Sequence, residues 1–370
     1  MAGYRTGFKT FKLFKPFKTF GTIGTVGTIG TSVKYRQHDS MLPNTKWCVL
    51  FALVFAMLPC GSARSQEKIR VGLGSISLQS GLVHIGKDRG LFAKYGLATE
   101  SIYIPGGSTN VQVLVSGSLD LSQLSGAPGV GANLEGADLI YLVGLLDKLN
   151  YQLVTRPEIK TLEQLKGKKF AVSRFGSSAD FGMRAMLKRV GVDPVKEASI
   201  LQVGDEPTRI AAITSGNIDG TVVNAPFSSE AERLKLNVLA DSLKMNIPFF
   251  NTGLLVSKRY LDKQDAKVMN FLRAYLESIK VLKTEREYSV KALAQFTRVQ
   301  NLKAIQEGYD YFVNQLPNVP YPSLEAMQAV VAQIAESNPK ARNVDAKNYV
   351  SDRYLKRLEE EGFVKKLWGK

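Results

Sequence analysis

The chain has 370 residues, with 49 Lys and Arg against 33 Asp and Glu and a formal net charge of +16. Residues 1–65 hold nine of the basic residues and one Asp, which leaves the remaining chain with a net charge of +8 and its charges mixed along the sequence. That part has no basic block interleaved with aromatic side chains, so we expect no nucleic-acid binding. Both cysteines, Cys48 and Cys60, also precede residue 66, which excludes a disulfide, a zinc-thiolate site or a cysteine nucleophile in the rest of the chain.

The first 65 residues do not have the pattern of a folded domain. Residues 1–40 are a low-complexity basic extension, rich in repeated Phe-Lys and Gly-Thr pairs. Residues 41–65 combine a basic residue, an apolar run over 47–58 and small residues after it, which is the pattern of a cleavable signal peptide. Two interpretations of the extension stay open: a segment upstream of a true start at Met41, or a genuine basic arm. We do not expect a lipid anchor at Cys60, because the three residues before it make a poor lipobox.

From residue 66 onward, short apolar strands alternate with helices. The first part predicts strands at 69–73, 99–104, 119–124 and 140–145, with helices at 82–92 and 110–116. The next part repeats this order, with helices at 162–166, 179–190 and 207–214 and strands at 169–173, 200–203, 220–223, 238–240 and 251–257. Such alternation predicts mainly parallel α/β sheets. Beyond residue 265 the pattern is almost wholly helical, with apolar residues three and four apart in 268–284, 289–296, 302–312, 323–336 and 351–361.

One five-residue pattern occurs twice, 99 residues apart, as Ser116-Gly117-Ser118-Leu119-Asp120 and as Ser215-Gly216-Asn217-Ile218-Asp219. Each copy follows a predicted helix and precedes a strand that leads into Ala-Pro. A repeat at this spacing indicates two lobes of similar build.

The repeated pattern also suggests where the lobes divide. We expect a discontinuous first lobe, 66–155 plus 254–370, which includes the helical C-terminal tail, and an inserted second lobe at 156–253. Two crossings of the chain, near Arg156 and Thr252, would then form a hinge beside a cleft between the lobes.

Loops rich in Ser, Thr, Asn and Gly follow several of the predicted strands. Ligands of α/β sheets bind at the carboxyl ends of strands, and the helix N-termini that begin there attract anionic groups. The loops in question are 75–79, 106–109, 125–128, 173–178 and 224–226. For each Ser or Thr in them the alternative role is to cap the helix that follows.

Two further side chains have roles that the sequence leaves open. Arg174 lies in one of these loops, where its guanidinium either pairs with a sulfonate or carboxylate as a fork or is a solvated surface group. His84, the single histidine after residue 65, falls in the predicted helix 82–92. It either lines the cleft or is partly buried in the packing of that helix.

Several segments, taken in order, resemble periplasmic solute-binding proteins of the nitrate/sulfonate/taurine type (SsuA/THI5-like, NMT1-like). These segments are Lys68-Ile69-Arg70-Val71-Gly72, Gly86-Lys87-Asp88-Arg89-Gly90-Leu91-Phe92-Ala93-Lys94-Tyr95-Gly96-Leu97, Gly107-Ser108, Leu162-Glu163-Gln164-Leu165-Lys166-Gly167-Lys168-Lys169-Phe170-Ala171-Val172 and both copies of the repeated pattern. The resemblance implies an α/β fold of the type II periplasmic-binding-protein kind, with two α/β lobes around a ligand cleft and a two-crossing hinge.

The resemblance also implies a function. It predicts a periplasmic, monomeric protein that is not an enzyme, has no cofactor or metal, and delivers a small anionic or heterocyclic solute to the permease of an ABC importer. Together with the loops above, it places the ligand contacts at Ser75, Ser77, Gln79, His84, Gly107, Ser108, Ser125, Ala127, Arg174, Ser177, Ser178 and Asn224.

Two alternatives use the same cleft. A ligand-sensing module that reports to a membrane signalling partner would have the same sequence features. An enzyme of the related THI5-like pyrimidine-synthesis branch is disfavoured, because that branch carries a cysteine-rich CCCFC motif and this chain has no cysteine after residue 65.

Overall fold

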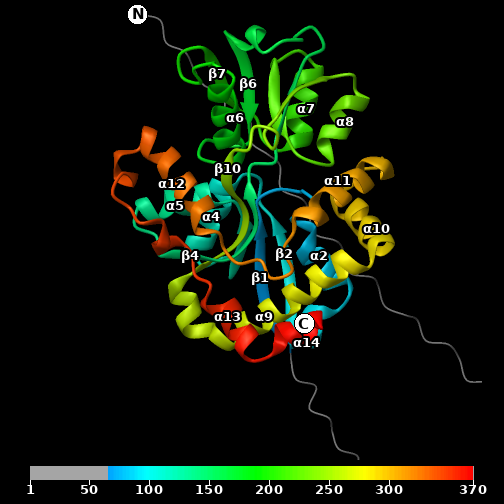
Figure 1. The fold of residues 1–370 in the computed structure, drawn as a ribbon, viewed down its shortest axis with the longest axis vertical. Helices are drawn as coiled ribbons and strands as arrows, with labels where there is room; N and C mark the ends of the chain where they lie inside the picture. Colours follow the sequence, from blue (N-terminus) through cyan, green and yellow to red (C-terminus); the bar gives the residue numbers. More distant parts are fainter. Residues whose placement is uncertain (1–65, 370) are drawn as a thin grey trace, which may run out of the picture. The chain divides into compact units, whose positions relative to one another are not determined.

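The structure, a computed structural model, describes residues 66–369, which contain two five-stranded sheets (Figure 1). The expected N-terminal extension, signal peptide and Cys60 lie outside these residues. The first sheet has the strand order β2-β1-β3-β10-β4. Its strands are β1 (Glu67–Leu73), β2 (Leu97–Tyr103), β3 (Leu121–Leu124), β4 (Leu139–Lys148) and β10 (Pro248–Ser257). Since β1 is parallel to β2 and β3, the loops that follow these three strands begin at one edge of the sheet.

The second sheet repeats this arrangement, with the order β7-β6-β8-β5-β9. Its strands are β5 (Gln152–Thr155), β6 (Lys168–Val172), β7 (Ala198–Gln202), β8 (Gly220–Val223) and β9 (Asn237–Asp241). β6 is parallel to β7 and β8, and β5 is antiparallel to β8 and β9. In the first sheet β10 takes the place of β5, antiparallel to β3 and β4. The two lobes of similar build that the repeated pattern predicts are therefore present.

The strand pairing corrects where the chain crosses between the lobes. β5 belongs to the second sheet and the whole of β10 to the first, so the crossings lie at 149–151 and 242–247 and not near Arg156 and Thr252. The first lobe is thus 66–148 plus 248–369, and the second is 152–241. At the first crossing the sequence has no Gly or Pro to mark a turn, whereas the second crossing is a turn that ends before Pro248.

Helices cover both faces of the first sheet. One face carries α2 (Gly81–Asp88), α3 (Leu91–Lys94) and α9 (Lys258–Thr284), and the other carries α4 (Gly107–Val115), α5 (Gly126–Leu134) and α12 (Leu324–Ser337). Side chains of β10 alternate between the two faces, as a strand with both faces buried requires. Leu254 and Val256 join the core on the α9 side, and Leu255 joins the core that includes Met327 of α12.

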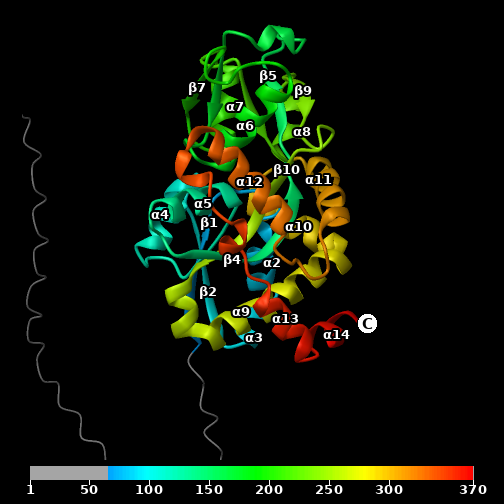
Figure 2. The same ribbon diagram turned by 60° about the vertical axis from the view of Figure 1, so that its left-hand side comes forward.

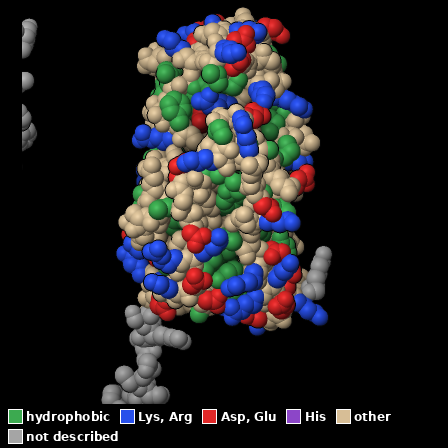
Figure 3. Space-filling view, turned by 90° about the vertical axis from the view of Figure 1, so that its left-hand side faces the viewer, with side chains coloured by type: hydrophobic (Ala, Val, Ile, Leu, Met, Phe, Trp, Pro, Cys, Tyr) green, Lys and Arg blue, Asp and Glu red, His purple; other side chains and the backbone are tan. Residues whose placement is uncertain are grey.

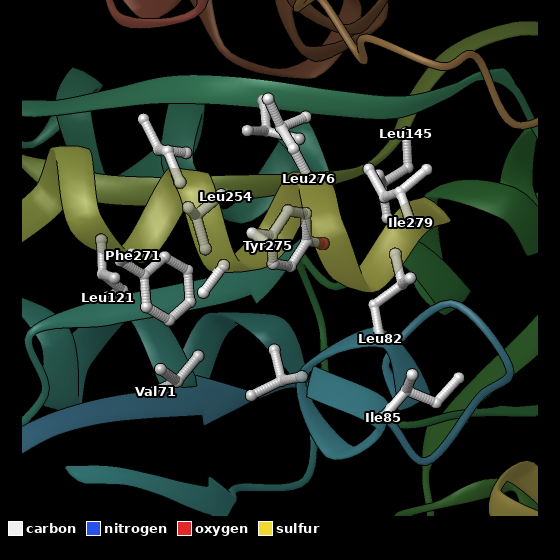
Figure 4. Packing of buried hydrophobic residues seen from close by; sticks show 14 of the residues in the cluster. Val71, Leu82, Ile85, Leu121, Leu145, Leu254, Phe271, Tyr275, Leu276 and Ile279 are labelled. Carbon is white, nitrogen blue, oxygen red and sulfur yellow. The ribbon is translucent and has the colours of Figure 1, made fainter. Parts of the chain in front are cut away.

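Helix α9 supplies the centre of the first core (Figure 4). Its side chains Phe271 and Tyr275 are fully buried and pack with Val71 of β1 and Leu82 of α2. A helical segment capped by Ser257, which accepts a hydrogen bond from the Tyr260 N–H at 3.2 Å, precedes the predicted 268–284 and joins it across a kink at Gln264. Burial of this apolar stripe, and not helix propensity alone, holds α9 in place.

The remaining helices of the first lobe are C-terminal: α10 (Arg286–Thr297), α11 (Leu302–Gln315), α13 (Arg353–Glu360) and α14 (Phe363–Trp368), with short 3₁₀ turns η2 (Pro339–Ala341) and η3 (Ala346–Tyr349). The second lobe contains the helices α6 (Ser178–Arg189), α7 (Glu206–Thr214) and α8 (Phe227–Arg233), with the 3₁₀ turn η1 (Glu163–Leu165). The helical tail was predicted, whereas α5, which begins inside the expected loop 125–128, and α8, which follows the expected loop 224–226, were not. Both begin close to Ala-Pro, which has the sequence signature of a loop.

Candidate functional site

A cavity of about 1130 Å³ lies between the two lobes. The first lobe contributes the loops after β1 and β2 and the turn 297–301 between α10 and α11. The second lobe contributes residues from α6, α7 and α8. We call this space the main cavity. Figure 2 shows α11 and α8 near one another at the border of the lobes.

The loop after β1 forms one wall of the main cavity through Gly74, Ser75 and Ile76. Ser75 lines the cavity, and its Oγ donates to Ser77 Oγ at 3.3 Å. Ser77 and Gln79 are buried behind it. The amide nitrogen of Gln123, on β3, donates to the carbonyl oxygen of Gln79 at 2.7 Å, which fixes the loop against the neighbouring strand. The side-chain oxygens of Gln79 and Gln123 are both buried without a partner among the described residues.

The lobes touch where the loop after β2 meets the loop after β6. Ser108 Oγ donates to the carbonyl oxygen of Phe175 at 3.2 Å. Beside it, the Arg174 side chain lies over Gly106, where an added Cβ would come within 2.7 Å of Arg174 Cγ. This contact separates the main cavity from a second cavity of about 1030 Å³, which Ser108, Ala127 and Ser177 help to line. Gly107 is on the main-cavity side.

Two adjacent serines at the start of α6 face different cavities. Ser177 caps α6, since its Oγ accepts from the Asp180 N–H at 3.3 Å, and it also donates to the Arg174 carbonyl at 2.6 Å. Ser178 lines the main cavity, and its Oγ accepts a hydrogen bond from the Tyr151 hydroxyl at 3.1 Å. Capping therefore accounts for Ser177, whereas Ser178 is presented to the space between the lobes.

The other expected ligand contacts line neither cavity. Arg174 is exposed on the surface. His84 stacks on Phe296 of α10 with 5.5 Å between ring centroids, and burial lowers the pKa of its imidazole. Ser125 precedes α5 as its buried cap residue, and its carbonyl accepts from the Tyr141 hydroxyl at 2.5 Å. Asn224 is buried after β8.

Helix α7 brings to the main cavity three charged residues that the sequence analysis did not single out. Asp205 caps the helix by accepting from the Thr208 N–H at 3.1 Å. Arg209 is 2% exposed and donates to Thr221 Oγ1 at 2.9 Å and to two carbonyl oxygens. Glu206 is 7% exposed, and its Oε1 accepts from the Asn224 N–H at 3.0 Å. Burial raises the pKa of Glu206 to about 7, against the opposing effect of Arg209.

A usable signal for these residues was present in the sequence. Asp205 and Glu206 follow the predicted strand 200–203 after a single residue, Gly204, at the edge where ligand loops are expected. The predicted helix 207–214 begins just after this acidic pair, which was in none of the expected ligand loops. Tyr103, at the end of β2, also lines the cavity and gave no signal beyond its position in a strand.

Within residues 66–369, no cluster of three His, Cys, Asp or Glu side chains is placed to hold a metal ion. In the same part of the chain, no helix is both long and apolar enough to cross a membrane. Basic and acidic side chains are intermixed over the face shown in Figure 3. The arrangement at the main cavity is that of hydrogen-bonding groups from two lobes around a space of small-molecule size.

Comparison with known proteins gives the family. The sequence model of the NMT1-like family matches residues 62–296. A protein of Escherichia coli (strain K12), described as an aliphatic sulfonates-binding protein, is 27% identical over 244 residues, which cover 62% of this chain and 72% of that protein.

Solved structures give the fold. The alkanesulfonate-binding protein SsuA from Xanthomonas axonopodis pv. citri, bound to MOPS, has a TM-score of 0.64 at 21% identity, over 77% of this chain and 98% of that chain. The periplasmic nitrate-binding protein NrtA from Synechocystis PCC 6803 has a TM-score of 0.66 at 14% identity, over 80% of this chain and 88% of that chain. The expected type II periplasmic-binding-protein fold is confirmed. Because the family model matches well over half of the 370 residues, the chain belongs to the NMT1-like family.

Proposed function

We propose that this protein is an extracytoplasmic solute-binding protein. It captures a small anionic or heterocyclic solute in the main cavity and delivers it to the permease of an ABC importer. It works in the periplasm as a monomer, after removal of the signal peptide at 41–65.

The observation that carries the proposal is the main cavity itself. It lies between two α/β lobes that are joined by two crossings, and its walls come from both lobes. A ligand that contacts Ser75 and Gly107 on one side and Ser178 and Glu206 on the other would favour the closed arrangement, because it binds both lobes only when they are together. The similarity to proteins described as sulfonate- and nitrate-binding supports a solute-binding role.

A thermal-shift screen of the purified protein tests this proposal. The panel contains alkanesulfonates, carboxylates, nitrate and pyrimidines, and every hit is measured again by calorimetry. We expect at least one solute to raise the melting temperature and to bind with one-to-one stoichiometry, because a ligand that binds only the native state stabilises it. Turnover of a solute, or failure of the whole panel to bind, would contradict the proposal.

A further inference from the structure

Glu206 is the first residue of α7 and lies on the wall of the main cavity that faces the first lobe. More than nine-tenths of the residue is buried. Within the described residues, its Oε1 takes one hydrogen bond, from the backbone N–H of Asn224. A buried carboxylate can accept several more hydrogen bonds, and each one that is missing costs free energy.

The charged neighbours on α7 already have other partners. The carboxylate of Asp205 accepts from the first turn of the helix. The guanidinium of Arg209 directs its hydrogen bonds to Thr221 Oγ1 and to the carbonyl oxygens of Gly204 and Val222, all within the second lobe. Arg209 therefore lowers the free energy needed to ionise Glu206, but its N–H groups donate to other acceptors.

Most of the groups that line the cavity with Glu206 from other elements are neutral or paired. Tyr103 of β2 and Tyr151 of the first crossing line the same cavity, and burial raises the pKa of both phenols. On α8, Arg233 donates to both carboxylate oxygens of Glu230, at 2.5 and 2.9 Å. Arg298, in the turn 297–301, also lines the cavity and is exposed, but it makes no ion pair with Glu206. Among the described residues, the Glu206 carboxylate therefore has no cationic partner.

We infer that Glu206 is a specificity-determining residue, whose carboxylate accepts a hydrogen bond from a nitrogen-bearing group of the ligand, an amino group or a protonated ring nitrogen. This inference rests on the proposed function and narrows its ligand class. Within anionic solutes it selects those that also carry an amino group, and within heterocyclic solutes it selects basic nitrogen heterocycles. A charge-assisted hydrogen bond of this kind is stronger than a neutral one. A solute that carries only negative charge would meet a like charge here.

The position of Glu206 also predicts how the affinity for the ligand changes with pH. Burial raises the pKa of Glu206 to about 7 in the unliganded protein. A cationic nitrogen binds the ionised carboxylate, so its affinity rises from pH 6 to pH 8. Since only about a tenth of the groups are ionised one pH step below the pKa, we expect about a tenfold gain over this window. The affinity for a solute with only negative charge would instead fall from pH 6 to pH 8.

Matched solute pairs and the Glu206→Gln variant test the inference. The pairs are 3-aminopropanesulfonate against propanesulfonate, and 4-aminopyrimidine against pyrimidine, measured by calorimetry at pH 6, 7 and 8. The glutamine keeps an oxygen for the Asn224 N–H and removes only the charge. We expect the wild-type protein to prefer the amino member of a pair by at least about tenfold, and to show the pH slope for 3-aminopropanesulfonate, whose ammonium group stays charged from pH 6 to pH 8. Glu206→Gln should lose both the preference and the pH slope.

The control is Glu232→Gln, an exposed change on α8 outside the cavity lining, which should leave affinity and slope unchanged. Melting temperatures show that each variant is folded. If solutes bind but the amino members gain nothing, or if Glu206→Gln binds them as well as the wild type, the inference is wrong and the proposed function stands. If neither these pairs nor the wider panel binds, both are wrong.

Discussion

Asn251 donates a hydrogen bond from its Nδ2 to Oδ1 of Asn150 at 2.6 Å, which ties the outgoing crossing of the chain to the returning strand β10. A second polar contact lies a few residues away. Ser242 Oγ accepts from the backbone N–H of Tyr151 at 2.8 Å and donates to the carbonyl oxygen of Leu149 at 2.9 Å. The two crossings are bonded side by side, so we expect them to bend together when the lobes move.

Ser242→Ala should destabilise the protein by about 1–3 kcal/mol, because it leaves a buried N–H and a buried carbonyl without the hydroxyl that serves both. Ser242 is completely buried. The measurement is the free energy of unfolding in denaturant, compared with Ser337→Ala. Ser337 is exposed and makes one long hydrogen bond to Ile334 at 3.4 Å, so its removal should cost less than about 0.5 kcal/mol. Equal losses of unfolding free energy in the two variants would show that the hydrogen bonds of Ser242 add no stability.

Gly308→Ala should push the two lobes apart on the α11 side. A Cβ at Gly308 would lie 2.7 Å from Leu78 Cδ1 in the first lobe and 2.8 Å from Ala225 Cβ in the second. Because the crowding involves both lobes, we expect a loss of about 1–3 kcal/mol of stability and a more open average shape in solution scattering.

The matched control for this substitution is Gly131→Ala in α5. A Cβ there meets nothing within 4 Å, so the change should stabilise its helix by roughly 0.5–1 kcal/mol. A Gly308→Ala protein that is as compact and as stable as the wild type would contradict the close contact between α11 and the second lobe.

Much of the fold could be predicted because it depends on local patterns. Ile69, Val71 and Leu73 alternate along β1 and all face the same core. The repeated pattern also had a physical basis that the structure makes visible. Asp120 accepts a hydrogen bond from the Arg70 N–H at 2.7 Å, and Asp219 accepts from the Lys169 N–H at 2.8 Å. Each Asp therefore locks its lobe's helix-to-strand turn onto a neighbouring parallel strand, β1 in the first sheet and β6 in the second.

The candidate site was harder to predict because it depends on contacts far apart in the chain. Tyr103 and Glu206 face one cavity although about a hundred residues separate them, and no local pattern shows that they meet. The crossings were misplaced because β5 begins directly after the first of them, without Gly or Pro between. The expected serine contacts are spread more widely than one cleft: Ser75 and Ser178 line the main cavity, and Ser108 and Ser177 line the second one.

The stability of the unliganded protein should fall as the pH rises from about 4.5 to 7, to the extent that Glu206 controls it. Its pKa is raised from the ordinary value of 4.5 to about 7 by burial. Between these values the unfolded chain ionises at Glu206 and the folded chain does not, so rising pH favours unfolding. Below pH 4.5 both states are protonated, and the full effect is present above pH 7. Glu206→Gln removes this loss.

The variant should therefore match the wild type near pH 4 and exceed its stability at pH 8, by an amount on the order of 3 kcal/mol. Denaturant unfolding at both pH values gives the comparison, with Glu232→Gln as the exposed control. A constant difference between Glu206→Gln and the wild type at the two pH values would mean that Glu206 ionises alike in the folded and unfolded chains.

Arg174 tests how the ligand's negative charge is held. The sequence made it a candidate fork for a sulfonate or carboxylate, but its side chain is exposed, lies over Gly106 and lines neither cavity. We expect Arg174→Ala to change the affinity for any anionic hit of the screen by less than about twofold, since a solvated charge outside the cavity is screened. Calorimetry against Ser178→Ala, which alters the cavity wall itself, gives the contrast. A tenfold loss in Arg174→Ala at an unchanged melting temperature would instead mean that the loop after β6 turns inward when the ligand binds.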